Sequence, residues 1–373
     1  MALIVGIIQL TKTMNLNFSF FGKLPFTILL MASLFGCGSS NNGGDDAPGT
    51  SVPVDTTKKD TVVVTENFAK GADVSWLTQM EAEGYKFYSQ SGKQTECIAL
   101  LKSMGTNAIR LRVWVNPTGG YCNKQDVLAK AERAQALGMK LMIDFHYSDT
   151  WADPGSQTVP AQWKNYNLQQ LDSAVASHTE DVLGALKQKN IDVEWVQVGN
   201  ETVSGMLWPL GQATGNKFSG FASLVKSGYA AVKQIYPKAK VIIHLDKGQE
   251  LSHYTWMFDG LKAAGAKWDV IGMSLYPDDS NWQSYATQCL SNITTLYKRY
   301  NTPCMICEVG MSWDSSKASS LMSTLIINGK QNKACLGLFY WEPECYNNFQ
   351  RYSKGAFDST GKPTSALLTY SIY

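Results

Sequence analysis

Short apolar segments alternate with longer amphipathic segments over most of this chain. The apolar segments predict strands at residues 69–74, 108–115, 140–146, 195–200, 240–245, 270–276, 303–309 and 336–341. Apolar residues at helical spacing lie between them, at 125–137, 168–189, 218–235, 254–264 and 316–328. This alternation is typical of consecutive βαβ units with a parallel sheet. Eight such units predict one α/β domain, a single (β/α)8 TIM barrel, over residues 67–373.

Two doubly wound domains are the alternative architecture. They would need a glycine-rich phosphate turn after a strand or a clear linker near the middle of the chain. No G-x-G-x-x-G follows a predicted strand, no P-loop is present, and no long Pro/Gly/Ser-rich stretch interrupts residues 67–373. The single barrel is therefore the favoured interpretation.

Residues 1–37 have the pattern of an export signal. Lys23 precedes an apolar run at 24–35, which is too short to span a bilayer comfortably as a helix. The following Leu34-Phe35-Gly36-Cys37 resembles a bacterial lipobox, which implies lipidation of Cys37; ordinary signal cleavage nearby is the alternative. The stretch before Met14 fits this signal poorly, so we treat Met14 as a candidate for the true start.

Residues 38–66 are rich in Gly, Ser, Asn, Asp, Thr and Pro and predict a flexible linker. Within it, Gly43-Gly44-Asp45-Asp46 resembles acidic signals that send some bacterial lipoproteins to the cell surface, although a solvated linker explains it as well. We therefore expect an exported protein, held at the outer membrane or cell surface only through a lipid at Cys37.

Seven cysteines remain if Cys37 is lipidated, and export makes disulfides possible. The better candidates are those in predicted loops or helix ends: Cys97, Cys122, Cys289 and Cys345. Cys304 and Cys307 lie on one predicted strand, roughly 10 Å apart and beyond disulfide reach. We expect these two to be buried, unpaired thiols.

Charge and histidine content narrow the possible functions. The 33 basic and 31 acidic residues are spread along the chain, which leaves no basic stripe for nucleic acid. The chain has 4 histidines and neither an HExxH motif nor zinc-like Cys/His spacing. We therefore expect neither a cofactor nor a catalytic metal.

Polar and aromatic residues gather where the predicted strands end. They are Arg112, Trp114, Asp144, His146, Asn200, Glu201, Tyr276, Glu308 and Trp341. Catalytic groups of TIM barrels lie at the carboxyl ends of the strands. Such residues at one rim of an apolar barrel cost stability unless function holds them there, so they predict an active-site mouth.

Glu201 and Glu308 are the candidate catalytic pair. Glycosidic bond cleavage uses two carboxyl groups, one as acid/base and one as nucleophile. A single glutamate at a strand end is more often a solvated loop residue, but on the fourth and seventh strands the pair resembles that of a large clan of retaining glycosidases. That resemblance makes Glu201 the acid/base, with a raised pKa, and Glu308 the ionised nucleophile.

The remaining candidates are assigned to substrate binding. Arg112 or Arg110 is expected to favour the charged form of Glu308, and Arg110, which lies deeper, alternatively pairs with a structural carboxylate. Alternation places Trp114 on the same side of its strand as both arginines.

Three of the candidates have specific expected contacts. Asn200 is expected to bond the sugar 2-hydroxyl, Tyr276 to orient Glu308, and Trp341 to stack on a sugar ring, although either aromatic residue would also suit the core. Asp144 and His146 share one side of the third strand and are expected near the cleavage point.

Six segments together resemble glycoside hydrolase family 53, the arabinogalactan endo-β-1,4-galactanases. These are residues 70–75 (KGADVS), 110–114 (RLRVW), 144–155 (DFHYSDTWADPG), 198–201 (VGNE), 205–209 (GMLWP) and 340–343 (YWEP). The resemblance runs from about Phe68 to near the C-terminus. It departs from the family at Thr202-Val203-Ser204, where members more usually carry bulkier or amide residues.

This resemblance implies a (β/α)8 barrel, a retaining two-step mechanism, and galactan side chains of pectin as the polysaccharide substrate of a monomeric enzyme. Two alternatives remain open. One is a clan member that cleaves β-1,4-mannan or glucan with the same pair of glutamates. The other is a surface glycan-binding lipoprotein that has lost catalysis.

Overall fold

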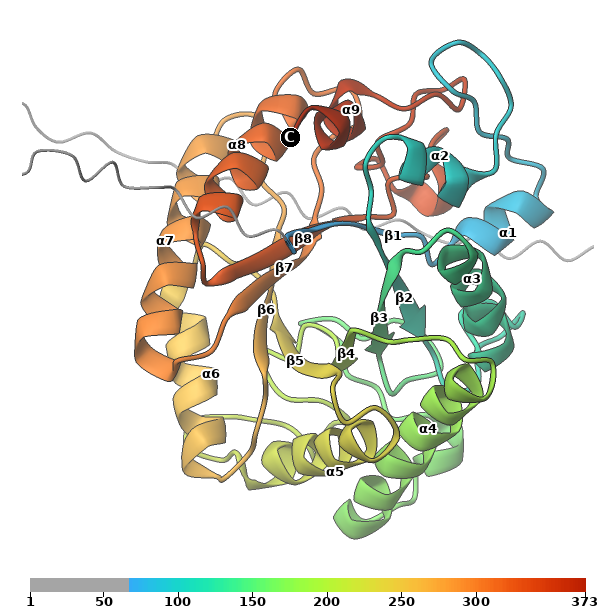
Figure 1. Ribbon diagram of the computed structural model, residues 1–373. Coiled ribbons are helices and arrows are strands. Elements are labelled where there is room, and N and C mark those ends of the chain that lie inside the picture. The colour runs from blue at the N-terminus through green and yellow to red at the C-terminus, as the bar shows by residue number, and fades with distance from the viewer. Residues whose placement is uncertain (1–66) are drawn as a thin grey trace, which may run out of the picture. The chain divides into compact units, whose positions relative to one another are not determined.

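The computed structural model describes residues 67–373, which form a closed barrel of eight parallel strands (Figure 1). The strands are β1 (Ala69–Asp73), β2 (Ala108–Val113), β3 (Lys140–Phe145), β4 (Trp195–Val198), β5 (Lys240–Leu245), β6 (Val270–Leu275), β7 (Cys304–Val309) and β8 (Cys335–Trp341). Strand β8 pairs with β1 and closes the barrel. Each predicted strand is present, and the predicted TIM barrel is confirmed.

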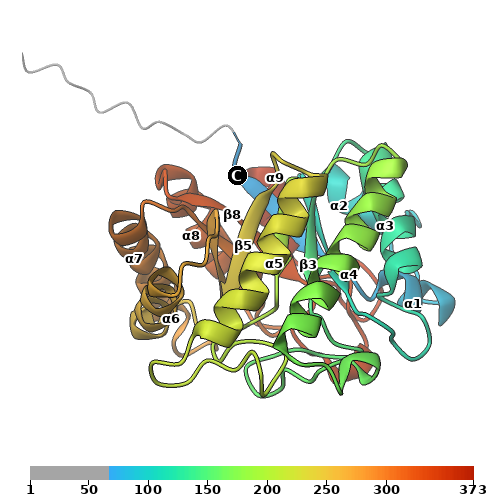
Figure 2. The same cartoon turned by 90° about the horizontal axis from the view of Figure 1, so that it is seen from below.

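Helices surround the barrel on all sides (Figures 1 and 2). They are α1 (Leu77–Ala82), α2 (Cys97–Ser103), α3 (Lys124–Ala136), α4 (Leu168–Gln188), α5 (Ser219–Ile235), α6 (Leu251–Ala263), α7 (Trp282–Tyr300), α8 (Ala318–Gln331) and α9 (Ser365–Ile372). Two 3-10 turns, η1 (Ala161–Trp163) and η2 (Phe349–Arg351), lie in loops. The five helical ranges named from sequence correspond to α3, α4, α5, α6 and α8.

Local sequence explains where helix α4 begins and which face it buries. Asn167 and Gln170 form a capping box, in which each side chain bonds the backbone N–H of the other residue. Leu171, Val175 and Val182 then recur at helical spacing and are buried. The helix packs against the barrel through this apolar face.

The barrel interior changes from apolar to polar along the strands. The apolar layer consists of Ala69, Ala108, Met142, Trp195, Ile242, Val270, Met305, Cys307 and Phe339. Gly71 leaves room for it, because a Cβ there would lie 2.1 Å from the Phe339 ring. Nearer the carboxyl ends, the buried residues are charged or polar, with Asp73 paired in register with Arg110. The site therefore lies above a closed apolar floor.

The disulfide expectation was wrong for the part of the chain that the structure describes. All seven cysteines there are buried and unpaired, including the four favoured candidates: Cys97, Cys122, Cys289 and Cys345. Cys97 lies on the buried side of α2 and Cys289 on that of α7, so both pack as core residues. Cys304 and Cys307 are buried, unpaired thiols, as expected.

Residues 1–66 lie outside the described part of the chain. The predicted export signal at 1–37, the lipidation of Cys37 and the linker at 38–66 therefore stay predictions. Between residues 67 and 373, no helix is both long and apolar enough to cross a membrane.

Candidate active site

A pocket of about 340 Å³ opens at the carboxyl ends of the strands and contains both candidate glutamates. Its lining is His146, Trp151, Ala152, Asp153, Asn200, Glu201, Tyr276, Glu308, Trp341, Tyr352 and Lys354. These residues come from the ends of β3, β4, β6, β7 and β8 and the loops that follow them. Five strands thus deliver side chains to one cavity.

Glu308 lies at the end of β7 and is held by two groups. The Arg110 guanidinium contacts its Oε1 at 2.9 Å, and the Tyr276 hydroxyl donates to its Oε2 at 2.7 Å. Only 5% of the glutamate remains exposed. Tyr276 therefore has the position that the sequence analysis expected, and Arg110 supplies the positive charge.

Arg110 is itself fixed by a buried network of acceptors. Its guanidinium donates to Asp73 at 2.6 Å, Asp144 at 3.0 Å, Gln197 at 2.7 Å and Asn200 at 3.0 Å. Charge-assisted hydrogen bonds of this kind satisfy a buried guanidinium in a fixed orientation. Burial would raise the pKa of Asp144, but Arg110, His146 and His244 together outweigh burial and lower that pKa.

Glu201 follows β4 in a left-handed backbone conformation, with φ 44°. The Ser274 hydroxyl donates to its Oε1 at 2.7 Å and lies 2.8 Å from Nε2 of His244. A register shift between β6 and β7 places Ser274 opposite Glu308. Ser274 therefore donates a hydrogen bond to Glu201 from a position in register with Glu308.

The two glutamates differ in their electrostatic surroundings. Burial and the nearby Glu308 carboxylate raise the pKa of Glu201 well above its usual value. Burial also raises the pKa of Glu308, but Arg110 and the Tyr276 hydroxyl oppose that rise. Glu201 has no cation in hydrogen-bond contact among residues 67–373. Glu201 is therefore the better proton donor, and Glu308 is the better anion.

His146 and Asn200 line the pocket with their side chains already oriented. His146 accepts from Ala152 N–H at 3.1 Å through Nδ1, so its Nε2 donates to Asp144 at 3.0 Å. Burial lowers the pKa of His146, which favours the neutral ring. The Asn200 amide donates to the Ala152 carbonyl at 2.9 Å. Both side chains are therefore held in fixed orientations at the pocket wall.

Three residues assigned to substrate binding do not line this pocket: Arg112, Trp114 and Asp144. Arg112 contacts Glu342 at 2.9 Å and lies over the Trp151 ring at 4.2 Å. Of the two arginines expected to favour the charged form of Glu308, Arg110 makes the contact and Arg112 does not. Trp114 donates to His146 at 3.2 Å. All three groups therefore support residues that line the pocket.

Aromatic rings form one wall of the pocket. Trp341 packs edge-on against Tyr352, with ring centroids 4.7 Å apart, and lies 6.0 Å from Trp151. Trp341 was expected here. Trp151 lies within the motif at 144–155, although its role was not assigned, whereas Tyr352 comes from the loop after β8 and gave no sequence signal.

Sequence reasoning also missed Ser274 and His244. Ser274 precedes Tyr276 by two positions, so strand alternation places both inside the barrel. His244 lies in β5 and was the one strand histidine left unassigned. Across residues 67–373, no three His, Cys, Asp or Glu side chains are grouped as metal ligands; the expectation of no metal and no cofactor stays a prediction.

A (β/α)8 barrel with two unlike carboxyl groups in one aromatic-walled pocket has the architecture of a glycoside hydrolase. The family model for glycosyl hydrolase family 53 matches residues 69–326. The chain belongs to that family, which confirms the resemblance seen in its motifs and makes it a glycoside hydrolase.

Named relatives agree with this assignment. The probable arabinogalactan endo-beta-1,4-galactanase A of Neosartorya fischeri is 32% identical over 305 residues, which cover 75% of this chain and 85% of the relative. The arabinogalactan endo-beta-1,4-galactanase of Humicola insolens is 31% identical over 330 residues, 82% of this chain and 98% of the relative. A solved catalytic domain from Ignisphaera aggregans superposes with TM-score 0.75 at 29% identity, covering 82% and 96% of the two chains.

Proposed function

We propose that this glycoside hydrolase is an endo-β-1,4-galactanase that cleaves galactan and arabinogalactan side chains of pectin with retention of configuration. The names of its relatives support the substrate. One observation supports the chemistry: Glu201 and Glu308 line the same pocket, and only Glu308 has a cation and a tyrosine hydroxyl as partners.

The first step breaks the glycosidic bond. The Glu308 carboxylate attacks the anomeric carbon, while the Glu201 carboxylic acid gives its proton to the departing glycosidic oxygen. Arg110 and Tyr276 keep Glu308 ionised and aimed until it forms the bond. The burial of Glu201 keeps its proton in place until the leaving oxygen needs it.

The second step releases the bound sugar. Glu201, now a carboxylate, takes a proton from water, and the resulting hydroxide equivalent attacks the anomeric carbon and frees Glu308. Asn200 is suited to bond the 2-hydroxyl, because its amide is fixed next to Glu201. Trp341 supplies a flat apolar surface on which a galactose ring can stack.

A product profile tests this proposal. Pure linear β-1,4-galactan should give short galacto-oligosaccharides of mixed length from the start, and proton NMR of the first products should show the β-anomer. Activity confined to β-1,4-mannan or glucan would overturn the substrate. An α-anomer as the first product would overturn retention. Binding of galactan without any product would indicate a glycan-binding protein instead.

We also propose that the enzyme is exported and held at the cell surface by a lipid on Cys37. The apolar run at 24–35 and the lipobox-like Leu34-Phe35-Gly36-Cys37 support this proposal. Mass spectrometry of the mature protein should find an acylated Cys37 at its N-terminus. A mature chain that begins elsewhere with an unmodified residue would remove the anchor.

A further inference from the structure

Two adjoining hollows lie outside the catalytic pocket, on the side of the barrel covered by helix α4. One is about 450 Å³ and lies between residues 155–164 and residues 208–210; the other is about 680 Å³ and lies along η1 and α4. They share Trp163 and Tyr166 in their walls. We call the two hollows together the α4 trough. None of its lining residues lines the catalytic pocket.

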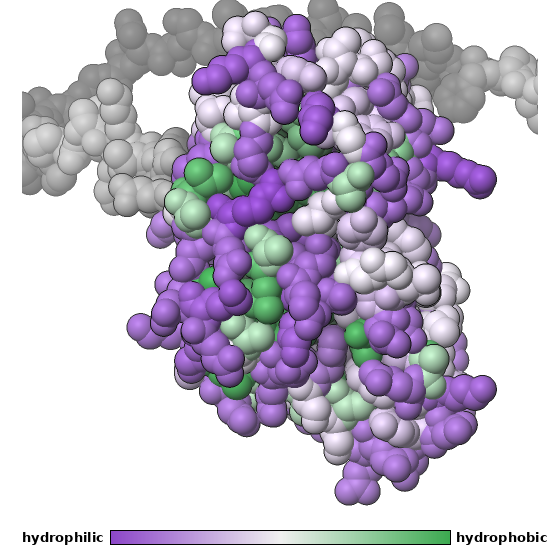
Figure 3. Space-filling view, turned by 90° about the vertical axis from the view of Figure 1, so that its right-hand side faces the viewer, coloured by the Kyte–Doolittle hydropathy of each residue, from purple (hydrophilic) through white to green (hydrophobic). Residues whose placement is uncertain are grey.

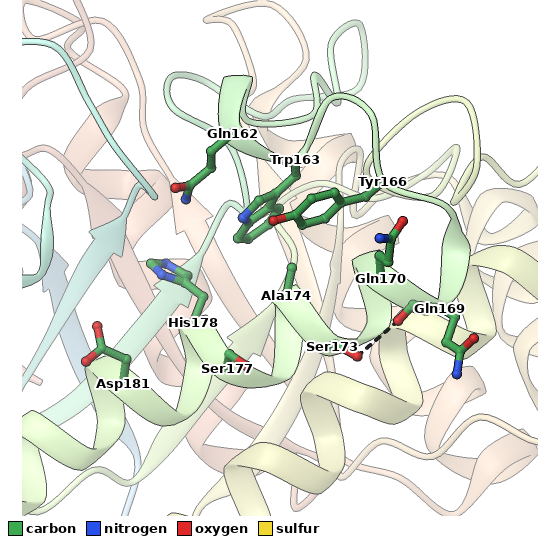
Figure 4. A pocket seen from close by; sticks show the side chains of 10 residues that line it. All are labelled: Gln162, Trp163, Tyr166, Gln169, Gln170, Ser173, Ala174, Ser177, His178 and Asp181. Atoms are coloured by element: carbon green, nitrogen blue, oxygen red, sulfur yellow. Dashed lines mark hydrogen bonds between the residues drawn. The ribbon is translucent and has the colours of Figure 1, made fainter.

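The lining of the α4 trough consists mainly of aromatic rings, apolar side chains and neutral hydrogen-bonding groups, and its charged members are Lys164 and Asp181. Figure 4 shows Trp163 and Tyr166 above helix α4, with Ala174 pointing from the helix toward the two rings. Tyr166 is 37% exposed, whereas its neighbour Trp163 is buried. Around the rings lie Gln162, Gln169, Gln170, Ser173 and Ser177.

Such a lining fits a neutral polyhydroxylated ligand better than an ion. Planar amides and hydroxyls bond sugar hydroxyls, and an exposed aromatic ring stacks on the apolar face of a pyranose. The carboxylate of Asp181 is already paired with Lys124 at 2.8 Å. Figure 3 shows that the surrounding surface on this side is mostly hydrophilic, with only separate apolar patches. A hydrophobic protein partner therefore fits less well.

Two residues that line the trough each have a buried polar atom with no partner in residues 67–373. Gln157 is 2% exposed, and its amide nitrogen donates to the carbonyls of Asn200 and Asp153, but its Oε1 accepts no hydrogen bond. Nε2 of His178 also lacks a partner. Burial lowers the pKa of His178 to about 4, so its ring is neutral near pH 7. A buried polar atom without a partner costs stability, and both atoms belong to residues that line the trough.

We propose that the α4 trough is a second carbohydrate-binding site that holds a pyranose segment of the polysaccharide. Tyr166 is the stacking platform, and the glutamines bond the sugar hydroxyls. This inference rests on the proposed function only in taking β-1,4-galactan as the polymer. The trough keeps the enzyme on its substrate between cleavage events, because it binds chain outside the catalytic pocket.

The test measures binding to galactan without cleavage. In a Glu308→Gln background, affinity electrophoresis in gels with and without galactan gives an apparent dissociation constant. Adding Tyr166→Ala should weaken retention about three- to tenfold, as expected for loss of one aromatic platform. Gln162→Ala with Gln169→Ala should weaken it as well. Tyr297→Ala is the matched control, because Tyr297 is 41% exposed on α7, outside the trough, and should leave retention unchanged.

The outcomes separate this inference from the proposed function. The proposed second site is wrong if neither Tyr166→Ala nor Gln162→Ala with Gln169→Ala changes retention. It is also wrong if Tyr297→Ala lowers retention by as much as these variants do. If the wild-type enzyme releases nothing from galactan, the proposed function fails, and the same variants are then compared on mannan, xylan and arabinan gels. Absence of retention on every polysaccharide overturns the second site. Thermal unfolding of each variant confirms that the fold is intact.

Discussion

Two sets of buried carboxyl groups lie at the same end of the barrel, and they differ in how their charge is balanced. Around Arg110, the carboxylates of Asp73, Asp144 and Glu308 share one guanidinium within 3.0 Å. Near Arg112, Glu342 has a guanidinium partner at 2.9 Å, but the fully buried Glu344 has no salt bridge to a cation within residues 67–373 and lies beside the Glu342 carboxyl group.

The two sets of carboxyl groups therefore differ in the protonation state that their surroundings favour. A cation and several hydrogen-bond donors favour the ionised form of the carboxyl groups around Arg110 and hold them rigidly, as the nucleophile proposed above requires. Burial, with the nearby Glu342 carboxyl group, raises the pKa of Glu344 well above its usual value, which favours the uncharged form of Glu344 in the folded protein. In the first group one cation balances carboxylates that include Glu308, whereas the buried Glu344 carboxyl group costs stability whenever the unfolded chain can ionise it.

The largest expected effect comes from removing the charge on the Arg110 side. Glu308→Gln should lower kcat on galactan by about a thousandfold or more, because it removes the nucleophile while keeping the shape of the side chain. Steady-state reducing-sugar assays measure this loss. Galactan binding and the unfolding temperature should change little. A variant that keeps a tenth of the activity would exclude Glu308 as nucleophile.

Removing the guanidinium of Arg110 tests how far the protein's stability depends on the cation that the carboxylates share. Arg110→Met should lower the free energy of unfolding by about 3–5 kcal/mol, because buried carboxylates then lack a counter-ion. Urea denaturation measures the change. Arg110→Lys is the control, because it keeps the positive charge but lacks the several N–H donors of the guanidinium group. If the methionine variant were as stable as the wild type, the network would not depend on its cation.

Tyr276→Phe sharpens the comparison between Glu308 and Glu201. The hydroxyl donates to the ionised form of Glu308, so its loss should raise the pKa of Glu308 and move the acidic limb of kcat/KM to higher pH. We expect kcat to fall about tenfold. A pH–rate profile separates the two effects, and the alkaline limb, assigned to Glu201, should move less. An acidic limb that stays in place would contradict this role of Tyr276.

The smallest effect is expected at Glu344. Its pKa is raised in the folded state, so above the unfolded pKa the unfolded chain holds fewer protons, and the stability of the wild type falls as pH rises. Glu344→Gln should remove this loss and raise the free energy of unfolding at pH 8 by about 1–3 kcal/mol, with little change near pH 4.

Glu342→Gln is the matched control for this prediction. It removes the counter-ion of Arg112 and should destabilise the protein at pH 8. Chemical denaturation at both pH values measures each difference. If Glu344→Gln destabilised the protein equally at pH 4 and pH 8, the effect of Glu344 on stability would come from its contacts and not from its protonation.

Local sequence pattern determined the strands, the closed barrel and the place of Glu201 and Glu308 at strand ends. Strand alternation and the position of a residue along its own strand are local properties, and the rule that active sites lie at the carboxyl ends needs nothing more. The same local reasoning placed Tyr276 and Trp341 correctly in the pocket lining.

Contacts between distant segments were decided only by the tertiary structure. Whether Arg110 or Arg112 reaches Glu308 depends on depth in the barrel, which is set by the stagger of neighbouring strands. The pairing of Ser274 with Glu308 depends on a register shift between β6 and β7, and the hydrogen bond from Ser274 to Glu201 joins β6 to the end of β4. The burial of the unpaired cysteines depends on helix packing. Each of these contacts joins residues that are far apart in the chain, so a local sequence pattern cannot predict it.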